Sequence, residues 1–431
     1  MVHPNLQRNP WPLVDSFLIP FSAMAGSSQL DLQPASKAAP ASGDRRQLRR
    51  LYLVEALASH ASTLLMLGIF FYMHRRFGWD SLHNLALSAS QGFFYVIGAL
   101  SSHRLSALMG RRRLMRATQC LMSPLVLLAA CWSNQWIIVA VLLLYTLLSA
   151  AQWPALESLV CSGADAHELS GRISLYNCLW AAVGAATLAV CGTIIEYFPR
   201  GLFLLAMAAH AVSAALLWRS LGDTREFPAA PPAPEPRLLA QRTLAMRLSR
   251  VALPATYAMM YALSAILPSL SVLHTMPPQW RTAAASVWML SRFFTFALLG
   301  VTIWWHTRPR ILPAAALILL LAFLGVVVPS PKLPLLTMIL SQIVLGAIMG
   351  LIYAASLYFG MVLSEGSTEH GGYHEALIGL GSILGPGAGA LAQSLRPGSP
   401  AASVIAVSAL LGVAALIAAA VSLQSRFKGN R

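Results

Sequence analysis

Apolar runs of about 20 residues follow one another along nearly the whole chain beyond residue 50. A helix needs about 20 residues to cross roughly 30 Å of hydrocarbon, since it rises about 1.5 Å per residue. The runs lack the strict alternation of membrane strands, and the composition agrees, with 57% hydrophobic and 10% charged residues. The sequence therefore predicts an all-α polytopic membrane protein. Twelve transmembrane helices are predicted, near residues 51–73, 82–102, 114–132, 136–158, 172–194, 200–219, 250–272, 282–305, 310–328, 334–360, 374–395 and 400–424.

The apolar runs form two halves of similar plan. Gln91-Gly-Phe-Phe aligns with Ser291-Arg-Phe-Phe at an offset of 200 residues, and a repeat of this kind marks copies of one structural unit. Residues 221–249 hold five prolines and have the composition of a linker. The predicted organisation is a disordered cytoplasmic tail (1–48), a six-helix bundle (49–220), a cytoplasmic Pro-rich linker (221–249), a second six-helix bundle (250–425) and a cytoplasmic tail (426–431).

The net charge of +15 is unevenly distributed over the loops. If the N-terminus is inside, 21 Lys and Arg residues fall on the cytoplasmic side and 6 on the outer side. The positive-inside rule then predicts an N-in/C-in orientation. The basic balance is thus a topology signal, and nucleic acid is not a predicted partner.

Two parallel six-helix halves joined by a long cytoplasmic loop resemble the major facilitator superfamily of secondary transporters, over residues 50–425. The local sequence supports the resemblance, because Gly98-Ala-Leu-Ser-Ser-His-Arg runs into Gly110-Arg-Arg-Arg between helices two and three. Ser102 stands where the family carries an acid. The resemblance implies a gating loop that includes Gly98, Gly110, Arg111 and Arg112.

A glycine-rich segment in helix eleven resembles the Gly-Pro signature that antiporters carry in helix five. Its position in helix eleven means that it does not indicate antiport, and no strand precedes it, as a dinucleotide fingerprint would require. Residues at a spacing of four share one helix face, where glycines let backbones approach closely. We therefore predict helix packing for Gly381, Gly385, Pro386 and Gly389.

Three ionisable residues lie deep in predicted spans: His60, His210 and Arg292. Each needs a reason, because insertion scales put the cost of a charge at the membrane centre at about 2.5–3.5 kcal/mol. The resemblance implies that helices one, four, seven and ten line a central cavity and that two, five, eight and eleven flank it, so Arg292 and His60 can face it. A guanidinium there could bind an anionic group of a substrate, or it could be a structural cation paired with carbonyls or a Glu.

Polar and aromatic residues on these helices complete the candidate substrate-binding set. Tyr257 and Tyr261 share a face of helix seven, and a few convergent polar groups in apolar walls are typical of a binding cavity. Each of these residues alone is as consistent with a contact between helices. The set is Arg292, His60, Gln91, Gln152, Trp153, Tyr257, Tyr261, Gln342 and Tyr353.

The acidic residues are expected near the cytoplasmic ends of the helices, within reach of water. Glu55 and His60 are the proton-coupling candidates, with a salt bridge or solvent for Glu55 and a neutral helix contact for His60 as alternatives. The other acids of this group are Glu157, Glu365, Glu369 and Glu375.

No metal site or cofactor is predicted. His370 and His374 have a spacing that would place two ligands on one helix face, but Gly371 and Gly372 disfavour a helix, and a cytoplasmic loop is expected. The five cysteines form no Cys-x-x-Cys pair and predict no disulfide framework. A nucleotide-binding loop and a catalytic constellation are both missing from the sequence, so we predict neither ATP-driven transport nor an enzyme.

The expected function is secondary active transport of a small organic solute by alternating access, with protons or sodium as coupling ions. An anionic or zwitterionic solute is favoured, because the deep positions offer Arg292 and His60 but no carboxylate. A proton-coupled multidrug or cationic-solute efflux antiporter is the alternative, and a non-transporting sensor or assembly factor of the same fold is another. A monomer in the bilayer of the cell (inner) membrane is expected.

Overall fold

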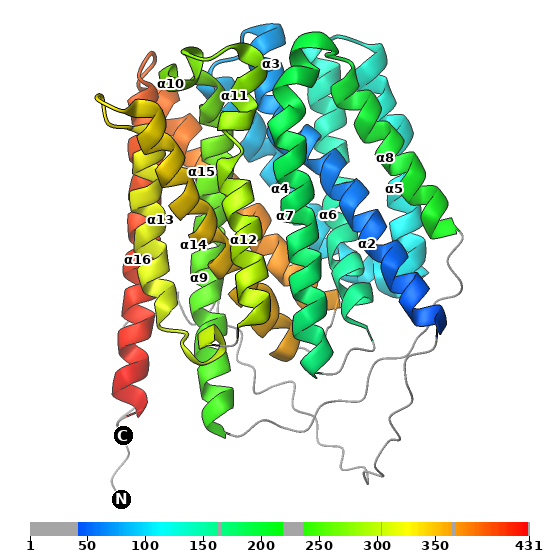
Figure 1. The fold of residues 1–431 in the computed structure, drawn as a ribbon, viewed down its shortest axis with the longest axis vertical. Coiled ribbons are helices and arrows are strands. Elements are labelled where there is room, and N and C mark those ends of the chain that lie inside the picture. The colour runs from blue at the N-terminus through cyan, green and yellow to red at the C-terminus, as the bar shows by residue number, and fades with distance from the viewer. Residues whose placement is uncertain (1–41, 163–165, 219–235, 303, 364–367, 430–431) are drawn as a thin grey trace, which may run out of the picture. The chain divides into compact units, whose positions relative to one another are not determined.

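The computed structural model describes residues 42–162, 166–218, 236–302, 304–363 and 368–429. Every regular element within these ranges is a helix (Figure 1). The first half contains α2 (Ser42–Thr63), the π-helical turn η2 (Leu64–Gly68), α3 (Ile69–Phe77), α4 (Ser81–Met109), α5 (Arg111–Cys131), α6 (Gln135–Cys161), α7 (Ala166–Tyr197) and α8 (Gly201–Trp218). The second half contains α9 (Pro236–Ile266), η3 (Leu267–Ser269), α10 (Ser271–His274), α11 (Pro278–Ala284), α12 (Val287–Val301), η4 (Trp304–Thr307), α13 (Ile311–Val327), α14 (Pro334–Leu363), α15 (Thr368–Leu395) and α16 (Pro400–Gly429).

The predicted all-α polytopic fold is confirmed. Among the described residues, 11 helical stretches are long and apolar enough to cross a membrane, and Ile311–Val327 is a shorter apolar helix. Each predicted span coincides with one of these stretches, the first with α2, η2 and α3 together. The N-in/C-in orientation stays a prediction from the charge distribution.

Several helices extend beyond the spans predicted from apolarity. α2 begins at Ser42, inside the predicted tail, and α9 begins at Pro236, inside the predicted linker. A proline fits the first turn of a helix because its missing N–H has no partner there in any case. Residues 1–41 of the predicted tail and 221–235 of the predicted linker lie outside the described residues.

Local sequence sets the helix ends. The backbone of Gly78 after α3 and of Gly110 between α4 and α5 has φ of 69° and 88°, a region that favours glycine. The Asp80 side chain caps α4 by accepting from His83 N at 3.0 Å. The Asn134 side chain caps α6 by accepting from Trp136 N at 2.8 Å. Such caps satisfy amide groups that the first helical turn leaves without partners.

Residues 46–431 form one compact unit in which helices of the two sequence halves pack against each other. α4 packs along α15, and α7 packs along α11 and α12. Glycines permit close contact, because a Cβ at Gly92 of α4 would lie 2.6 Å from the backbone carbon of Ser382 in α15. The Asn84 amide also links the halves, donating to the carbonyls of Phe70 and Ala265 at 3.2 and 3.4 Å.

The glycine face predicted in helix eleven is a packing surface. A Cβ at Gly381 would lie 2.3 Å from the Pro254 carbonyl oxygen, and one at Gly385 would lie 2.0 Å from that of Ala258. Gly389 instead faces α4, where a Cβ would be 3.3 Å from the Leu85 side chain. α15 therefore needs glycine to lie against α9, and Pro386 is accommodated inside the same helix.

The 200-residue offset also relates His74 to His274, which meet across the two halves. Their rings stack at 5.8 Å between centroids. His74 Nδ1 contacts the Trp79 carbonyl at 2.7 Å, and His274 Nε2 contacts the Pro268 carbonyl at 3.0 Å. Equivalent positions of the repeat thus become neighbours in the fold.

Candidate functional site

A cavity of about 110 Å³ lies among helices of both halves. Its described lining comes from α2, η2, α4, α6 and α7 of the first half and from α9, α12, α14 and α15 of the second. In span order these are helices one, two, four, five, seven, eight, ten and eleven, the ones that the family resemblance implies. The lining residues are Glu55, Ser59, Ser62, Thr63, Met66, Leu67, Tyr95, Trp153, Tyr176, Trp180, Tyr257, Met260, Tyr261, Met289, Arg292, Tyr353, Glu375 and Ile378.

Arg292 of α12 lies in an aromatic cage at this cavity. Its side chain is 0% exposed, and its guanidinium carbon is 4.3 Å from the ring centre of Trp180 and 4.9 Å from that of Tyr353. Nη2 donates to the Tyr257 hydroxyl at 3.1 Å, and Nη1 lies 3.9 Å from Met260 Sδ. The cage holds the planar cation by ring faces, an attraction that grows when the charge is desolvated.

The positive charge of Arg292 has no ionic partner among the described residues. None of the ion pairs in this part of the chain includes it, and its buried Nε lacks a hydrogen-bond acceptor there. The alternative of a structural Arg paired with a Glu is therefore not what the described residues show. An unpaired buried charge is costly, so a countercharge beside Arg292 would stabilise it.

Three carboxyl groups that were expected to reach water are buried, so this expectation was wrong. Glu55, Glu157 and Glu375 are 1%, 2% and 3% exposed. The reason is that α2, α6 and α15 extend past the apolar runs, so residues placed at helix ends by hydropathy lie between packed helices. Glu55 and Glu375 line the same cavity as Arg292. Glu365 and the side chain of Glu369 lie outside the described part of the chain.

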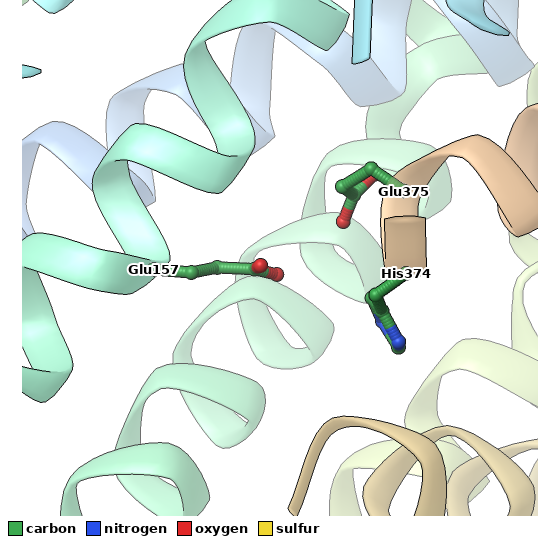
Figure 2. A group of neighbouring side chains, drawn as sticks. All are labelled: Glu157, His374 and Glu375. Atoms are coloured by element: carbon green, nitrogen blue, oxygen red, sulfur yellow. The ribbon is translucent and has the colours of Figure 1, made fainter. Parts of the chain in front are cut away.

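Hydroxyl groups hold two of these carboxylates in place. Ser59 Oγ donates to Glu55 Oε1 at 2.7 Å, and the Tyr95 hydroxyl donates to Glu375 Oε2. Glu157 and Glu375 lie beside His374, with one ligand atom of each within 4.8 Å of the others (Figure 2). The cavity wall is thus acidic at Glu55 of α2 and Glu375 of α15 and cationic at Arg292.

The structure brings six predicted site residues together at the cavity: Glu55, Trp153, Tyr257, Tyr261, Arg292 and Tyr353. The other four predicted residues make contacts between helices instead. His60 Nδ1 lies 2.8 Å from Thr187 Oγ1, and Gln342 donates to the Ala284 carbonyl at 2.9 Å. Gln91 donates to Thr146 Oγ1 at 3.4 Å. Gln152 accepts from Gln119 at 2.9 Å, and Gln119 contacts His210 at 2.7 Å.

Sequence reasoning missed several lining residues. Tyr95, Tyr176 and Trp180 were not selected, although Tyr176 and Trp180 are spaced by four and share a face of helix five. Met260 is the repeat counterpart of His60, and Met260 rather than His60 contacts Arg292. Met260 could have been found from the repeat, because it occupies the position in the second half that corresponds to His60 in the first.

The predicted gating loop contacts the end of α6 through Arg111. Arg111 Nη1 donates to the hydroxyls of Ser158 and Ser162 at the end of α6, at 2.7 and 3.1 Å. Arg112 is buried, and so is Ser102, which occupies the family's acid position. Gly98 belongs to the packing of α4 on α6, since a Cβ there would lie 2.2 Å from the Leu147 carbonyl oxygen.

The expectation of a loop around Gly371 and Gly372 was wrong, because α15 begins at Thr368. Both glycines fit a close approach: a Cβ at Gly371 would lie 3.3 Å from Pro154 of α6, and one at Gly372 would lie 3.2 Å from the Ala99 carbonyl of α4. Packing thus overrides the low helix propensity of glycine. His374 becomes a buried residue of the helix.

A family model described as Major Facilitator Superfamily matches residues 51–386. The chain belongs to the major facilitator superfamily. Among solved structures, the crystal structure of a mutant of the nucleoside transporter NupG superposes with a TM-score of 0.63 at 13% identity, covering 87% of this chain and 99% of that one. At this identity the likeness shows the fold alone. A search of curated proteins finds no significant match. The chain is thus a multi-pass membrane protein of a secondary-transporter family that handles small solutes.

Proposed function

We propose that this protein is a secondary active transporter that moves a small organic solute by alternating access of the central cavity. Arg292 binds an anionic group of that solute. The observation that carries the proposal is the charge of Arg292: a guanidinium that is 0% exposed, lines the cavity and belongs to no ion pair among the described residues.

The chemistry of arginine fits this role. A guanidinium presents parallel N–H donors that match a carboxylate or phosphate in two hydrogen bonds. At Arg292, Nη2 is partly engaged by Tyr257, whereas Nε has no acceptor among the described residues. A solute anion would supply the missing acceptor and the missing countercharge together.

Glu55 gives the cavity a second recognition element. One of its oxygens accepts from Ser59, and the other, Oε2, is buried without a described donor. A buried carboxylate in this position can be neutralised by a proton or by an ammonium group of the solute. Glu55 therefore supports a zwitterionic solute and supports proton coupling, and both fit the expected ion-gradient drive.

A cationic solute is the second candidate, because the cavity contains two acids, contrary to the expectation of none. Glu55 and Glu375 line it together with the ring faces of Trp180 and Tyr353, which can also attract cations. The positive charge of Arg292 would repel a cationic solute. Binding measurements with anions and cations therefore distinguish the two candidates.

The test is a melting-temperature screen of purified protein against organic anions, zwitterions, cations and nucleosides, with the nucleosides included because the NupG structure is that of a nucleoside transporter. A ligand at about 100 times its Kd stabilises the folded state by about 2.7 kcal/mol. We expect anions or zwitterions to raise the melting temperature of the wild type and of the exposed control Arg396→Gln, and to leave Arg292→Gln unchanged. Stabilisation by cations alone, or an equal response of Arg292→Gln, would refute the proposal.

A further inference from the structure

Glu157, His374 and Glu375 form a buried group at the contact of α6 with α15, next to the cavity. The three side chains are 2%, 2% and 3% exposed, and one ligand atom of each lies within 4.8 Å of the others. Figure 2 shows the carboxylates of Glu157 and Glu375 facing each other, with His374 on the same turn as Glu375. The group therefore places oxygen and nitrogen atoms of the two sequence halves side by side.

Glu157 is the member that calls for a ligand. Both of its carboxylate oxygens are buried, and neither has a hydrogen-bond partner among the described residues. A carboxylate in such a place faces a large desolvation cost, which a bound cation would offset. The backbone leaves space for it, because residue 371 is glycine and a Cβ there would lie 3.3 Å from Glu157 Oε2.

The neighbouring side chains hold the other two members of the group. Ser356 Oγ lies 3.0 Å from His374 Nδ1, and the Tyr95 hydroxyl donates to Glu375 Oε2. Metal-binding histidines usually engage the second ring nitrogen in a hydrogen bond that fixes the ring orientation, and metal-binding carboxylates are held in the same way. Ser356 and Tyr95 are positioned to do this for His374 and Glu375.

We propose that Glu157, His374 and Glu375 bind a divalent transition-metal ion, with Zn²⁺ as the fitting probe. One imidazole and two carboxylates are a donor set suited to Zn²⁺, which coordinates nitrogen at about 2.0–2.1 Å and oxygen at about 2.0–2.2 Å. A purely oxygen-binding ion such as Mg²⁺ is less suited, because imidazole favours zinc and its neighbours in the first transition row. The ion would bridge α6 to α15 and so connect the halves.

The test uses full-length, tag-free protein in detergent, stripped with EDTA and titrated with Zn²⁺ near pH 7 by calorimetry. We expect one high-affinity ion per chain. Removing a supporting hydrogen bond with Ser356→Ala should weaken binding about 10-fold to 100-fold, and removing a ligand with Glu157→Gln or His374→Gln should weaken it by more than that. Glu55→Gln is the matched control, since it removes a buried acid of the same cavity that is outside the group. It should weaken binding less than either ligand variant does.

Several results would overturn the proposal. They are the absence of stoichiometric Zn²⁺ binding by the wild type, binding that persists in both Glu157→Gln and His374→Gln, and an equal loss in Glu55→Gln. X-ray absorption of the zinc-loaded wild type keeps the proposal testable if a variant does not fold. The expected spectrum has one imidazole and otherwise oxygen ligands, and a sulfur ligand from any of the five cysteines would contradict it.

Discussion

Replacing Arg292 by methionine should remove anion binding without destabilising the ligand-free protein. The change deletes the hydrogen bond to Tyr257 and the contacts with the rings of Trp180 and Tyr353. Hydrogen bonds to charged groups contribute about 1.5–3 kcal/mol, and a desolvated cation–π contact contributes about 2 kcal/mol. The change also removes a buried charge whose desolvation costs several kcal/mol. The lost contacts and the relieved desolvation cost nearly cancel. We therefore expect the free energy of unfolding to change by about 1–2 kcal/mol or less.

A buried ion pair at Arg292 would give a larger loss of stability on replacement. If Arg292 were held by a buried ion pair, its removal would cost about 3–5 kcal/mol, because the partner charge would be left alone. The assay is denaturation of Arg292→Met in detergent beside the wild type and the exposed control Arg396→Met, first without ligand and then with the organic anion found in the screen. Two charge-assisted hydrogen bonds at about 1.5–3 kcal/mol each correspond to a loss of about 10²-fold to 10⁴-fold in anion affinity. A ligand-free loss of about 3 kcal/mol or more, the size expected for a broken buried ion pair, together with an unchanged anion affinity, would refute the reasoning.

Two further predictions concern packing and pH. Gly385→Ala should lower the free energy of unfolding by at least about 1–3 kcal/mol, the range for overpacked sites, because the new Cβ would lie 2.0 Å from the Ala258 carbonyl oxygen. Gly387→Ala, whose Cβ would be 3.9 Å from the Ala89 Cβ, should be neutral or stabilising, and equal melting temperatures of the two variants would contradict this. Burial, with a smaller effect of Arg242, lowers the pKa of His306 between α12 and α13 to about 4 from its usual 6.5. The unfolded chain then binds more protons between these pH values, so stability should fall as pH decreases from 6.5 to 4. His306→Phe, which can keep the ring stack on Tyr358, should make the melting temperature depend less on pH in this range. An unchanged pH dependence in this variant would contradict the assignment.

The membrane spans could be predicted from the sequence because bilayer thickness imposes a length and a polarity on each helix. The same argument cannot find where a helix continues beyond the hydrocarbon. Pro236 and Ser42 begin helices outside the apolar runs, and Gly371 and Gly372 are helical because α15 packs closely on α6 and α4. These features depend on neighbours that are distant in sequence.

The candidate site was predictable only in part for the same reason. Arg292 was identifiable because a charge deep in an apolar run needs a reason. Its cage was predictable only in part, since Tyr257 and Tyr353 were candidates and Trp180 was not. Glu157 and Glu375 were placed near water because hydropathy ranks them at helix ends, whereas the packing of α6 on α15 buries them. The repeat compares Gly92 with Arg292, but only the structure explains the difference: Gly92 lies against the backbone of Ser382, where no side chain fits.

The most direct test of the central claim is uptake of the identified solute into proteoliposomes, with and without an imposed proton gradient. We predict that the gradient drives accumulation by the wild type and that Arg292→Gln transports nothing under either condition. Glu55→Gln should still exchange solute across the membrane but should no longer respond to the gradient. Equal accumulation by Arg292→Gln and wild type would contradict the assignment of Arg292 as the solute-binding residue.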